Sequence, residues 1–366
     1  MTDAKLFTPL RAGALSLRNR VVMAPLTRNR ARPRDDAPID LHVDYYRQRA
    51  SAGLIISEGT QISPMGKGYA WTPGIHSPAQ IDGWRAVTDA VHAEGGTIVA
   101  QIWHVGRVSH SSLLPDGAQP VGPSALTAAT RTFDGEKFMP TSEPRAIDIG
   151  GIGRVLANYH HAAMNARSAG FDGVEIHAAN GYLIEQFMRA SSNTRTDAYG
   201  GSIENRTRFL EEVVATVSEA IGADRVGVRL SPFSHANGVE IDGAEELYSR
   251  AIERISAYGL AYLHLVEGET GGERSLPDPE AIARLRALFK GVYIANNGYD
   301  REMAIDAVES GAADAIAFGK LFISNPDLVE RLRRDAPLNA PDRDTFYGGG
   351  AKGYTDYPFL TEPTPA

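Results

Sequence analysis

The sequence predicts a (β/α)8 barrel, an α/β fold, and three observations lead to this fold class. Short β-rich runs alternate with longer helical patterns from residue 20 to about residue 334. None of these runs is followed by a GxGxxG or P-loop signature, which would favour the alternative of an open doubly wound sheet. Polar residues also follow the runs at their carboxyl ends, where barrels of this type carry their active sites.

Eight β-rich runs supply the expected strands. Alternating or continuous apolar character over a few residues, bounded by Gly, Pro or Asn, is typical of strands in a buried parallel sheet. The expected strands are 21–26, 54–61, 97–103, 173–177, 225–230, 262–267, 292–296 and 315–318.

Longer patterns with helical period separate these runs. We expect residues 6–17 to form a hairpin across one end of the barrel. Residues 105–148 are rich in Ser, Pro, Gly and Thr, so we expect a long loop after strand three over the active-site face. The chain 1–366 is expected to be one barrel domain. The expected helices are 80–93, 152–169, 201–220, 243–258, 278–289, 301–310 and 325–334.

Composition excludes several classes of function. The formal net charge is -8 with no block of like charges, which argues against nucleic acid or an acidic membrane as partner. No apolar run is long enough to span a membrane, and the start lacks signal-peptide character, so a cytoplasmic protein is expected. Without cysteine there is no thiolate nucleophile or iron–sulfur cluster, and the ten histidines show no metal-ligand spacing. We expect a small-molecule substrate and no metal, in a monomer or a homo-oligomer.

The stretch 173–187, GVEIHAANGYLIEQF, joins an expected strand to an expected helix. It places His177, Asn180 and Tyr182 at the carboxyl end of the strand. His177 and Asn180 donate hydrogen bonds and Tyr182 carries a proton, which suits polarising a carbonyl or nitro oxygen and protonating a neighbouring carbon. Taken alone, the same residues also suit a satisfied structural pair and a core tyrosine.

Other strand ends carry groups that converge on one ligand. A Gly-rich turn after strand seven, Asn297 and Gly298, and the Gly319–Lys320 pair after strand eight suit a phosphate. Thr27, Gln101 and Arg229 follow strands one, three and five. Their donors and acceptor suit the edge of a heterocycle with carbonyls and ring nitrogens, such as flavin mononucleotide (FMN).

Six motifs resemble the old yellow enzyme family of flavin-dependent ene-reductases. The resemblance is to its threonine branch, with N-ethylmaleimide and glycerol trinitrate reductases, because Thr27 stands where another branch uses cysteine. The motifs are PLTRNR at 25–30, QIWHVGR at 101–107, GVEIHAANGYLIEQF at 173–187, NTRTDAYGGSIENRTRF at 193–209, FGKLFISNPDL at 318–328 and YGGGAKGYTDYP at 347–358.

The resemblance implies a set of FMN contacts. Thr27 would bond the flavin C4 carbonyl, Gln101 its pyrimidine edge, and Arg229 the N1 and C2 carbonyl region, where a cation stabilises the reduced flavin. The remaining implied contacts are backbone groups of Pro25 and Gly59 on the ring, and Asn297, Gly298, Gly319 and Lys320 on the phosphate. Lys320 replaces the arginine of many relatives, giving a point charge in place of a planar fork.

The resemblance also implies a reaction. Hydride from NADPH or NADH would pass through the flavin to the β-carbon of an activated alkene, in ping-pong order through one shared pocket. His177 and Asn180 would bind the electron-withdrawing oxygen, and Tyr182 would protonate the α-carbon. Tyr69 and Tyr347 are further candidates for shaping the substrate pocket, or for loop packing alone. The His177–Asn180 pair differs from the His-His pair of some bacterial relatives, so a preference for nitro compounds over enals does not follow from the resemblance. Nitro compounds and nitrate esters stay open as alternative substrates.

Two other classes of function stay open from the residues. One is a flavin-free hydrolase or isomerase that uses Glu58, Glu175 or Glu267 as acid and base. The other is a flavin-binding sensor without turnover, which would not need Tyr182. We further expect Glu175 to point into the barrel and to pair with Arg229 on the adjacent strand, because an unpaired buried carboxylate is costly. His104, His264 and Trp103 are expected to be buried.

Overall fold

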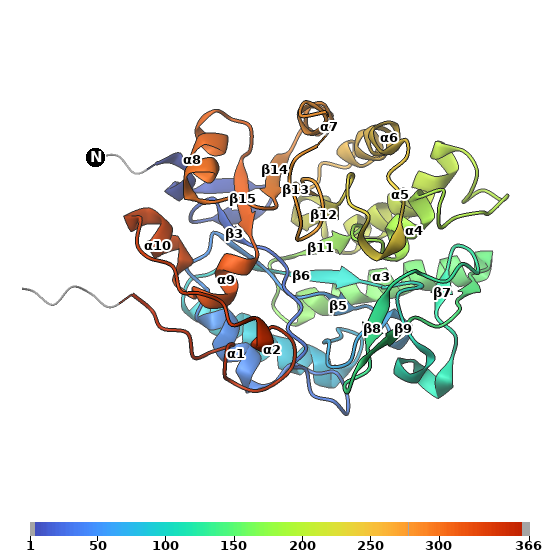
Figure 1. Cartoon of the computed structure of the whole chain (residues 1–366), viewed down its shortest axis with the longest axis horizontal. Coiled ribbons are helices and arrows are strands. Elements are labelled where there is room, and N and C mark those ends of the chain that lie inside the picture. Colours follow the sequence, from blue (N-terminus) through green and yellow to red (C-terminus); the bar gives the residue numbers. More distant parts are fainter. Residues whose placement is uncertain (1–3, 277, 361–366) are drawn as a thin grey trace, which may run out of the picture.

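The computed structural model describes residues 4–276 and 278–360. A ring of eight parallel strands stands at its centre, with helices around it (Figure 1). The ring runs β3, β4, β6, β11, β12, β13, β14, β15 and closes where β15 pairs with β3, Ile316 opposite Val21. The ring strands are β3 Val21–Met23, β4 Leu54–Ile56, β6 Ile98–Trp103, β11 Gly173–His177, β12 Val226–Leu230, β13 Tyr262–Val266, β14 Val292–Asn296 and β15 Ala315–Phe318. The expected (β/α)8 barrel is confirmed.

Helices fill the connections between the ring strands, and apolar periodicity explains their placement. In α5, for example, Leu210, Val213, Val214 and Val217 recur at helical spacing and are all buried. The helices are α1 Asp40–Arg47, α2 Pro78–Ala93, α3 Ile149–Ser168, α4 Leu183–Met188, α5 Ile203–Ile221, α6 Ala244–Ser256, α7 Ala281–Ala287, α8 Arg301–Glu309, α9 Lys320–Ser324 and α10 Leu328–Arg334. No helix was predicted before the second strand, where α1 lies.

Short elements complete the described chain. Strands β1 Leu10–Ala12 and β2 Leu15–Leu17 form the expected N-terminal hairpin. Outside the ring lie β5 Thr60–Gln61, β7 Val121–Gly122, β8 Arg131–Phe133, β9 Phe138–Pro140 and β10 Arg145–Ala146. Single 3-10 turns occupy Lys5–Phe7, Pro64–Gly66, Ser111–Leu113, Pro115–Gly117, Ala223–Arg225, Ala236–Gly238 and Arg343–Thr345.

The interior of the barrel changes from apolar to polar along its axis. At the amino ends of the strands, Leu15 and Leu17 of the hairpin pack against Val22, Leu54 and other apolar side chains inside the ring. Further along the axis, the ring of Tyr262 fills the space beside Gly227. A Cβ at Gly227 would stand 2.1 Å from that ring, so only glycine leaves room for it. Towards the carboxyl ends, the buried side chains are the polar residues Gln101, Glu175, Arg229, His264 and Asn296. One end of the barrel is therefore a sealed core, and the other offers polar groups to a ligand.

Two expected strands are shorter in the structure, and one helix was not expected. The first strand ends at Met23 before Pro25, and the second stops at Ile56, with β5 as a separate short strand. The expected helix 325–334 is preceded by α9, which begins directly after Gly319. The region 105–148 is the expected long insertion, yet it also contains the antiparallel pair β8–β9 and the parallel pair β7–β10.

Candidate active site

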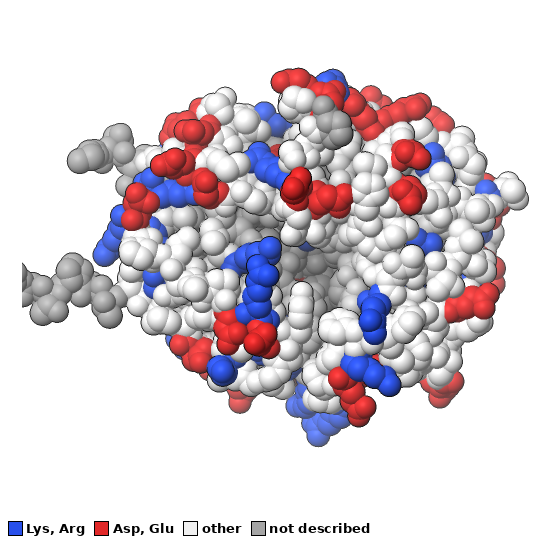
Figure 2. Space-filling model, viewed as in Figure 1, with Lys and Arg blue, Asp and Glu red and all other residues white. Residues whose placement is uncertain are grey.

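A cavity of about 1170 Å³ opens at the carboxyl ends of the barrel strands. Figure 2 shows the hollow near the centre of this face, with a strip of Lys and Arg side chains at its edge. Eleven residues singled out in the sequence line it, although they come from distant parts of the chain. They are Pro25, Thr27, Tyr69, Asn180, Tyr182, Arg229, Asn297, Gly298, Gly319, Lys320 and Tyr347.

Three other candidates are buried beside the cavity and are not among its lining residues. Gln101 is buried, and its Nε2 donates to Glu175 at 2.8 Å. Gly59 has a packing reason to be glycine, because a Cβ there would stand 2.6 Å from the buried indole of Trp103. His177 is 3% exposed, and its ring lies 5.9 Å from that of Trp103 and 5.0 Å from that of Tyr182. Trp103 therefore packs against His177 from below.

The hydrogen bonding of His177 fixes its tautomer. Its Nδ1 accepts the backbone N–H of Ala179 at 3.3 Å. Burial, with the Arg229 cation nearby, holds the pKa of His177 well below its usual range, so the ring is neutral. A neutral ring that accepts at Nδ1 carries its hydrogen on Nε2. His177 is therefore a neutral hydrogen-bond donor.

Asn180 presents an amide donor at the same strand end. Its side-chain Oδ1 accepts from the hydroxyl of Thr270 at 2.8 Å, which fixes the amide and leaves the NH2 group as the donor. The residue has a φ of 58°, and Gly181 follows with a φ of 71°. This left-handed turn brings the chain back from β11 into α4, so that Asn180 and Tyr182 both line the cavity.

Tyr182 precedes α4 and faces the cavity with its hydroxyl. The hydroxyls of Tyr182 and Tyr69 are 3.1 Å apart. Burial raises the pKa of Tyr182, so its phenol keeps a proton at neutral pH. Tyr69 is thus a direct partner of Tyr182, whereas Tyr347 is 60% exposed at the cavity edge.

Arg229 lines the cavity and carries an unsatisfied donor. Its Nη2 donates to Asn296 at 2.8 Å, while its buried Nε has no hydrogen-bond partner among the described residues. Burial lowers the pKa of Arg229, but a guanidinium stays charged at any ordinary pH. An orphaned buried N–H beside a ligand cavity is costly unless the ligand supplies an acceptor.

Glu175 points into the barrel as expected, but among the described residues it makes no direct ion pair with Arg229. Glu175 is fully buried inside the barrel, but it accepts from Gln101 at 2.8 Å and contacts Nδ1 of His264 at 2.9 Å. The strand register explains this, because Glu175 lies opposite Gly227 and Arg229 lies opposite His177. Burial alone would raise the pKa of Glu175; His264, Arg229 and Gln101 outweigh it and lower the pKa.

The proposed phosphate end of the cavity is made of turns with little side-chain bulk. Gly298 has a φ of 68°, and a Cβ on Gly319 would meet only Leu26, at 3.5 Å. The side-chain amide of Asn297 donates to the carbonyls of Glu267 and Glu269, so only its backbone is available to a ligand. Lys320 is exposed at the same edge. Backbone groups and one cation therefore remain for an anion.

Comparison with known proteins identifies the family. The model of the NADH:flavin oxidoreductase / NADH oxidase family matches residues 5–339. The chain belongs to this family, the old yellow enzyme family. It is 44% identical over 365 residues to a putative 12-oxophytodienoate reductase 11 of Oryza sativa subsp. japonica, covering 98% of both chains. It is 43% identical to a flavin oxidoreductase of Emericella nidulans, covering 97% of both chains.

Solved structures of the old yellow enzyme family have the same fold. Morphinone reductase matches with a TM-score of 0.94 and 50% identity, over 98% of this chain and 97% of that chain. Another structure is of morphinone reductase in complex with tetrahydroNAD, with a TM-score of 0.93 and 50% identity, over 97% of this chain and 98% of that chain. An old yellow enzyme homologue from Zymomonas mobilis matches with a TM-score of 0.93 and 44% identity, over 97% and 99%.

As an old yellow enzyme-like protein, the chain is an FMN-dependent NADH:flavin oxidoreductase, and the cavity fits that cofactor. The orphaned Nε of Arg229 would meet an acceptor on the flavin ring, and the turns at Gly298 and Gly319 leave room for a phosphate. The hydrolase interpretation is wrong, since Glu58, Glu175 and Glu267 are buried and do not line the cavity. The described residues include no group of three His, Cys, Asp or Glu placed to hold a metal ion. Within residues 4–276 and 278–360, no helix has the length and apolar character needed to cross a bilayer.

Two segments outside the barrel strands form walls of this oxidoreductase's cavity, and only the second was anticipated from the sequence. The β8–β9 hairpin contributes Phe133 and Phe138. An Asp134–Gly135 pair between its two short apolar runs is a hairpin signal that predicts this element. The second wall is a C-terminal segment with Phe346 and with Tyr347, which was a candidate from the sequence.

Two arginines hold the C-terminal wall in place. The guanidinium of Arg28 donates to the carbonyls of Phe346 at 2.9 Å and Gly353 at 2.8 Å. Arg30 donates to the carbonyl of Thr345 at 2.9 Å and lies 4.4 Å from the centre of the Tyr354 ring. Both arginines belong to the PLTRNR motif, which also contains Thr27. The motif therefore lines the cavity itself through Thr27 and holds the C-terminal wall through its arginines.

Proposed function

We propose that the protein is an ene-reductase that takes hydride from NADPH or NADH and reduces the C=C bond of electron-poor alkenes. Such alkenes include α,β-unsaturated ketones and aldehydes, maleimides and nitroalkenes. The observation that carries the proposal is the convergence of His177, Asn180 and Tyr182 at the end of β11. Two neutral donors and one protonated phenol suit an oxygen-activated alkene.

Each residue has a stated task in this proposal. The Nε2–H of His177 and the amide of Asn180 bind the carbonyl or nitro oxygen and draw electron density from the double bond. The hydroxyl of Tyr182 holds the proton that the α-carbon receives, and Tyr69 orients that hydroxyl. Bound FMN would supply the hydride for the β-carbon, held by Arg229, Thr27 and Gln101 at its ring edge and by the glycine turns at its phosphate.

The size of the cavity supports one pocket used in turn by both substrates. Its volume of about 1170 Å³ exceeds the roughly 300–1,000 Å³ of an ordinary ligand pocket. FMN therefore leaves space for one further molecule. The proposal is that NAD(P)H and the alkene occupy this space alternately, which requires ping-pong kinetics with parallel lines in double-reciprocal plots.

The test uses the visible spectrum of the purified protein. A flavin spectrum that bleaches on anaerobic addition of NADPH or NADH, and returns on addition of cyclohexenone, is the expected result. Return with glycerol trinitrate or a nitroarene and not with the enone would assign the enzyme to nitrate esters or nitro compounds instead. Bleaching without return by any of these acceptors would refute the alkene proposal and favour a flavin-binding sensor.

A further inference from the structure

The turn that carries Asn180 needs support from outside itself. Asn180 and Gly181 are both in the left-handed region, with φ values of 58° and 71°. A residue with a side chain seldom adopts this conformation, and it persists where neighbouring groups hold it. Relaxation of this turn would move Asn180, and with it Tyr182, relative to His177.

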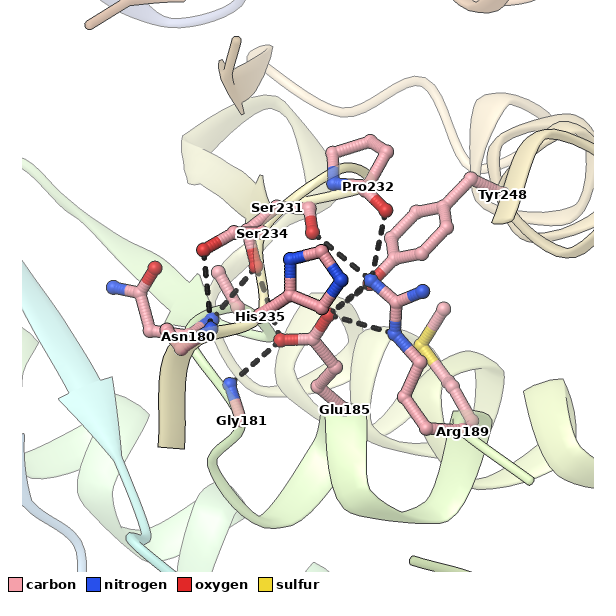
Figure 3. A network of polar contacts seen from close by, with 12 residues as sticks. Asn180, Gly181, Glu185, Arg189, Ser231, Pro232, Ser234, His235 and Tyr248 are labelled. Atoms are coloured by element: carbon pink, nitrogen blue, oxygen red, sulfur yellow. Dashed lines mark hydrogen bonds and ion pairs between the residues drawn. The ribbon is translucent and has the colours of Figure 1, made fainter. Parts of the chain in front are cut away.

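The carbonyls of the turn accept from Asn237 and Gln186, and its N–H groups are held through the carboxylate of Glu185, in the first turn of α4. Its Oε2 accepts the backbone N–H of Gly181 at 2.7 Å and the hydroxyl of Ser231 at 3.0 Å. The Ser231 hydroxyl in turn accepts the backbone N–H of Asn180 at 2.8 Å. Two successive N–H groups of the turn therefore converge on one carboxylate oxygen, directly and through one hydroxyl (Figure 3).

The other oxygen of Glu185 faces away from the turn. Its Oε1 accepts from Nε and Nη2 of Arg189 at 3.0 and 2.8 Å, and from the hydroxyl of Tyr248 in α6. Arg189 also donates to the carbonyls of Ser231 at 3.1 Å and Pro232 at 2.9 Å, which fixes the segment after β12 (Figure 3). Glu185 is fully buried and Arg189 is 1% exposed, so water does not compete for these bonds.

We propose that Glu185 and Ser231 are positioning residues that fix Asn180 at the substrate oxygen. Neither touches the cavity, and both act through the backbone of the turn. The inference rests on the proposed function, because it assigns these residues to alkene binding. A buried ion pair between Glu185 and Arg189 that serves only stability is the competing explanation.

A matched pair of variants separates the two explanations. Ser231→Ala removes the hydroxyl that bonds Asn180, whereas Tyr248→Phe removes a hydroxyl from the far oxygen of the same carboxylate. With the FMN-loaded enzyme, Ser231→Ala should raise the KM for cyclohexenone about tenfold, the effect of losing one typical hydrogen bond. Tyr248→Phe should leave the KM for cyclohexenone within about twofold of the wild-type value. Ser231→Thr should also keep a KM near the wild-type value, because threonine retains the hydroxyl that Ser231→Ala lacks.

Three results would overturn the inference. They are an equal rise in KM for both variants, an unchanged KM in Ser231→Ala, and a failure of Ser231→Thr to restore the KM. Melting temperatures of the two hydroxyl variants should fall to a similar extent, which shows that the KM difference does not follow stability.

A measurement on the unmodified holoenzyme covers the case that a variant does not fold. Hydrogen exchange of the Asn180 and Gly181 amides should be as slow as that of strand β11. Exchange as fast as in an exposed loop would refute the anchoring of the turn. A wild type that does not reduce cyclohexenone, yet protects both amides, refutes the proposed function and not the anchoring.

Discussion

Glu58 should make the stability of this protein fall as the pH rises from about 4.5 to about 7. Its carboxyl is fully buried, and burial raises its pKa from 4.5 to about 7. The hydrogen bonds that favour the ionised carboxylate are long, because the backbone N–H of Arg28 and the hydroxyl of Tyr46 both lie 3.4 Å from its oxygens. His42, at 3.6 Å, supplies no charge, because burial lowers its pKa to about 3.

The sign and size follow from the two pKa values. Below pH 4.5 the carboxyl is protonated in both the folded and the unfolded chain, so it contributes no pH dependence. Between these values the unfolded chain releases the proton and the folded chain keeps it, so the free energy of unfolding falls by about 1.4 kcal/mol per pH unit. The total loss is about 3 kcal/mol, and it levels off above pH 7.

The perturbation is Glu58→Gln, which keeps the shape and removes the titration. Urea unfolding of both proteins, with saturating FMN, is compared at pH 5, 6, 7 and 8. The free energy of the wild type minus that of the variant should decrease by about 2.5 kcal/mol from pH 5 to pH 8, because the unfolded chain is already partly ionised at pH 5. A difference that stays constant with pH would refute the reasoning, since it would mean that Glu58 is already ionised at pH 5.

Three further predictions concern single side chains. Tyr182→Phe should slow the return of the flavin spectrum with cyclohexenone by about 10²–10⁴-fold in anaerobic stopped-flow, without slowing bleaching by NAD(P)H, because only the proton donor is lost. Arg229→Lys should raise the Kd for FMN about tenfold or more in a fluorescence titration, because the orphaned Nε is removed while a charge remains. Gly227→Ala should lower the free energy of unfolding by about 1–3 kcal/mol in urea, because its Cβ would overlap the ring of Tyr262.

Each of the three predictions for single side chains would be contradicted by a specific result. Equal slowing of both half-reactions by the Tyr182 variant would make the hydroxyl a structural group. An unchanged Kd in the Arg229 variant would show that Nε does not meet the flavin. An unchanged urea midpoint in the Gly227 variant would show that the middle of the barrel has free space.

Sequence patterns predicted the barrel because each strand carries its own local signal. The residues that follow the strands could also be assigned to one site from the sequence, because the carboxyl ends of parallel strands meet at one face of the barrel. The partner of Glu175 could not be predicted in this way, because it depends on the register between strands. Gly227, and not Arg229, lies opposite Glu175, and no local pattern encodes that offset.

Contacts between distant segments were also beyond the sequence analysis. The bond from Ser231 to Asn180 joins two loops that follow neighbouring strands. The C-terminal wall contacts Arg28 across more than three hundred residues. Such pairings arise only when the barrel closes, and their residues look like ordinary polar loop residues in the sequence.

The closure of the barrel by its first and last strands has a consequence for biosynthesis. Thr27 follows β3, which emerges early from the ribosome, whereas the turn at Gly319 follows β15, which emerges late. The two ends of the proposed flavin pocket meet only after β15 has paired with β3, and the wall at Phe346 is added later still. The complete pocket can therefore form only once β15 has been synthesised. A nascent chain that has made seven of the eight strands exposes two unpaired edges, and such edges are prone to aggregation until the ring is complete.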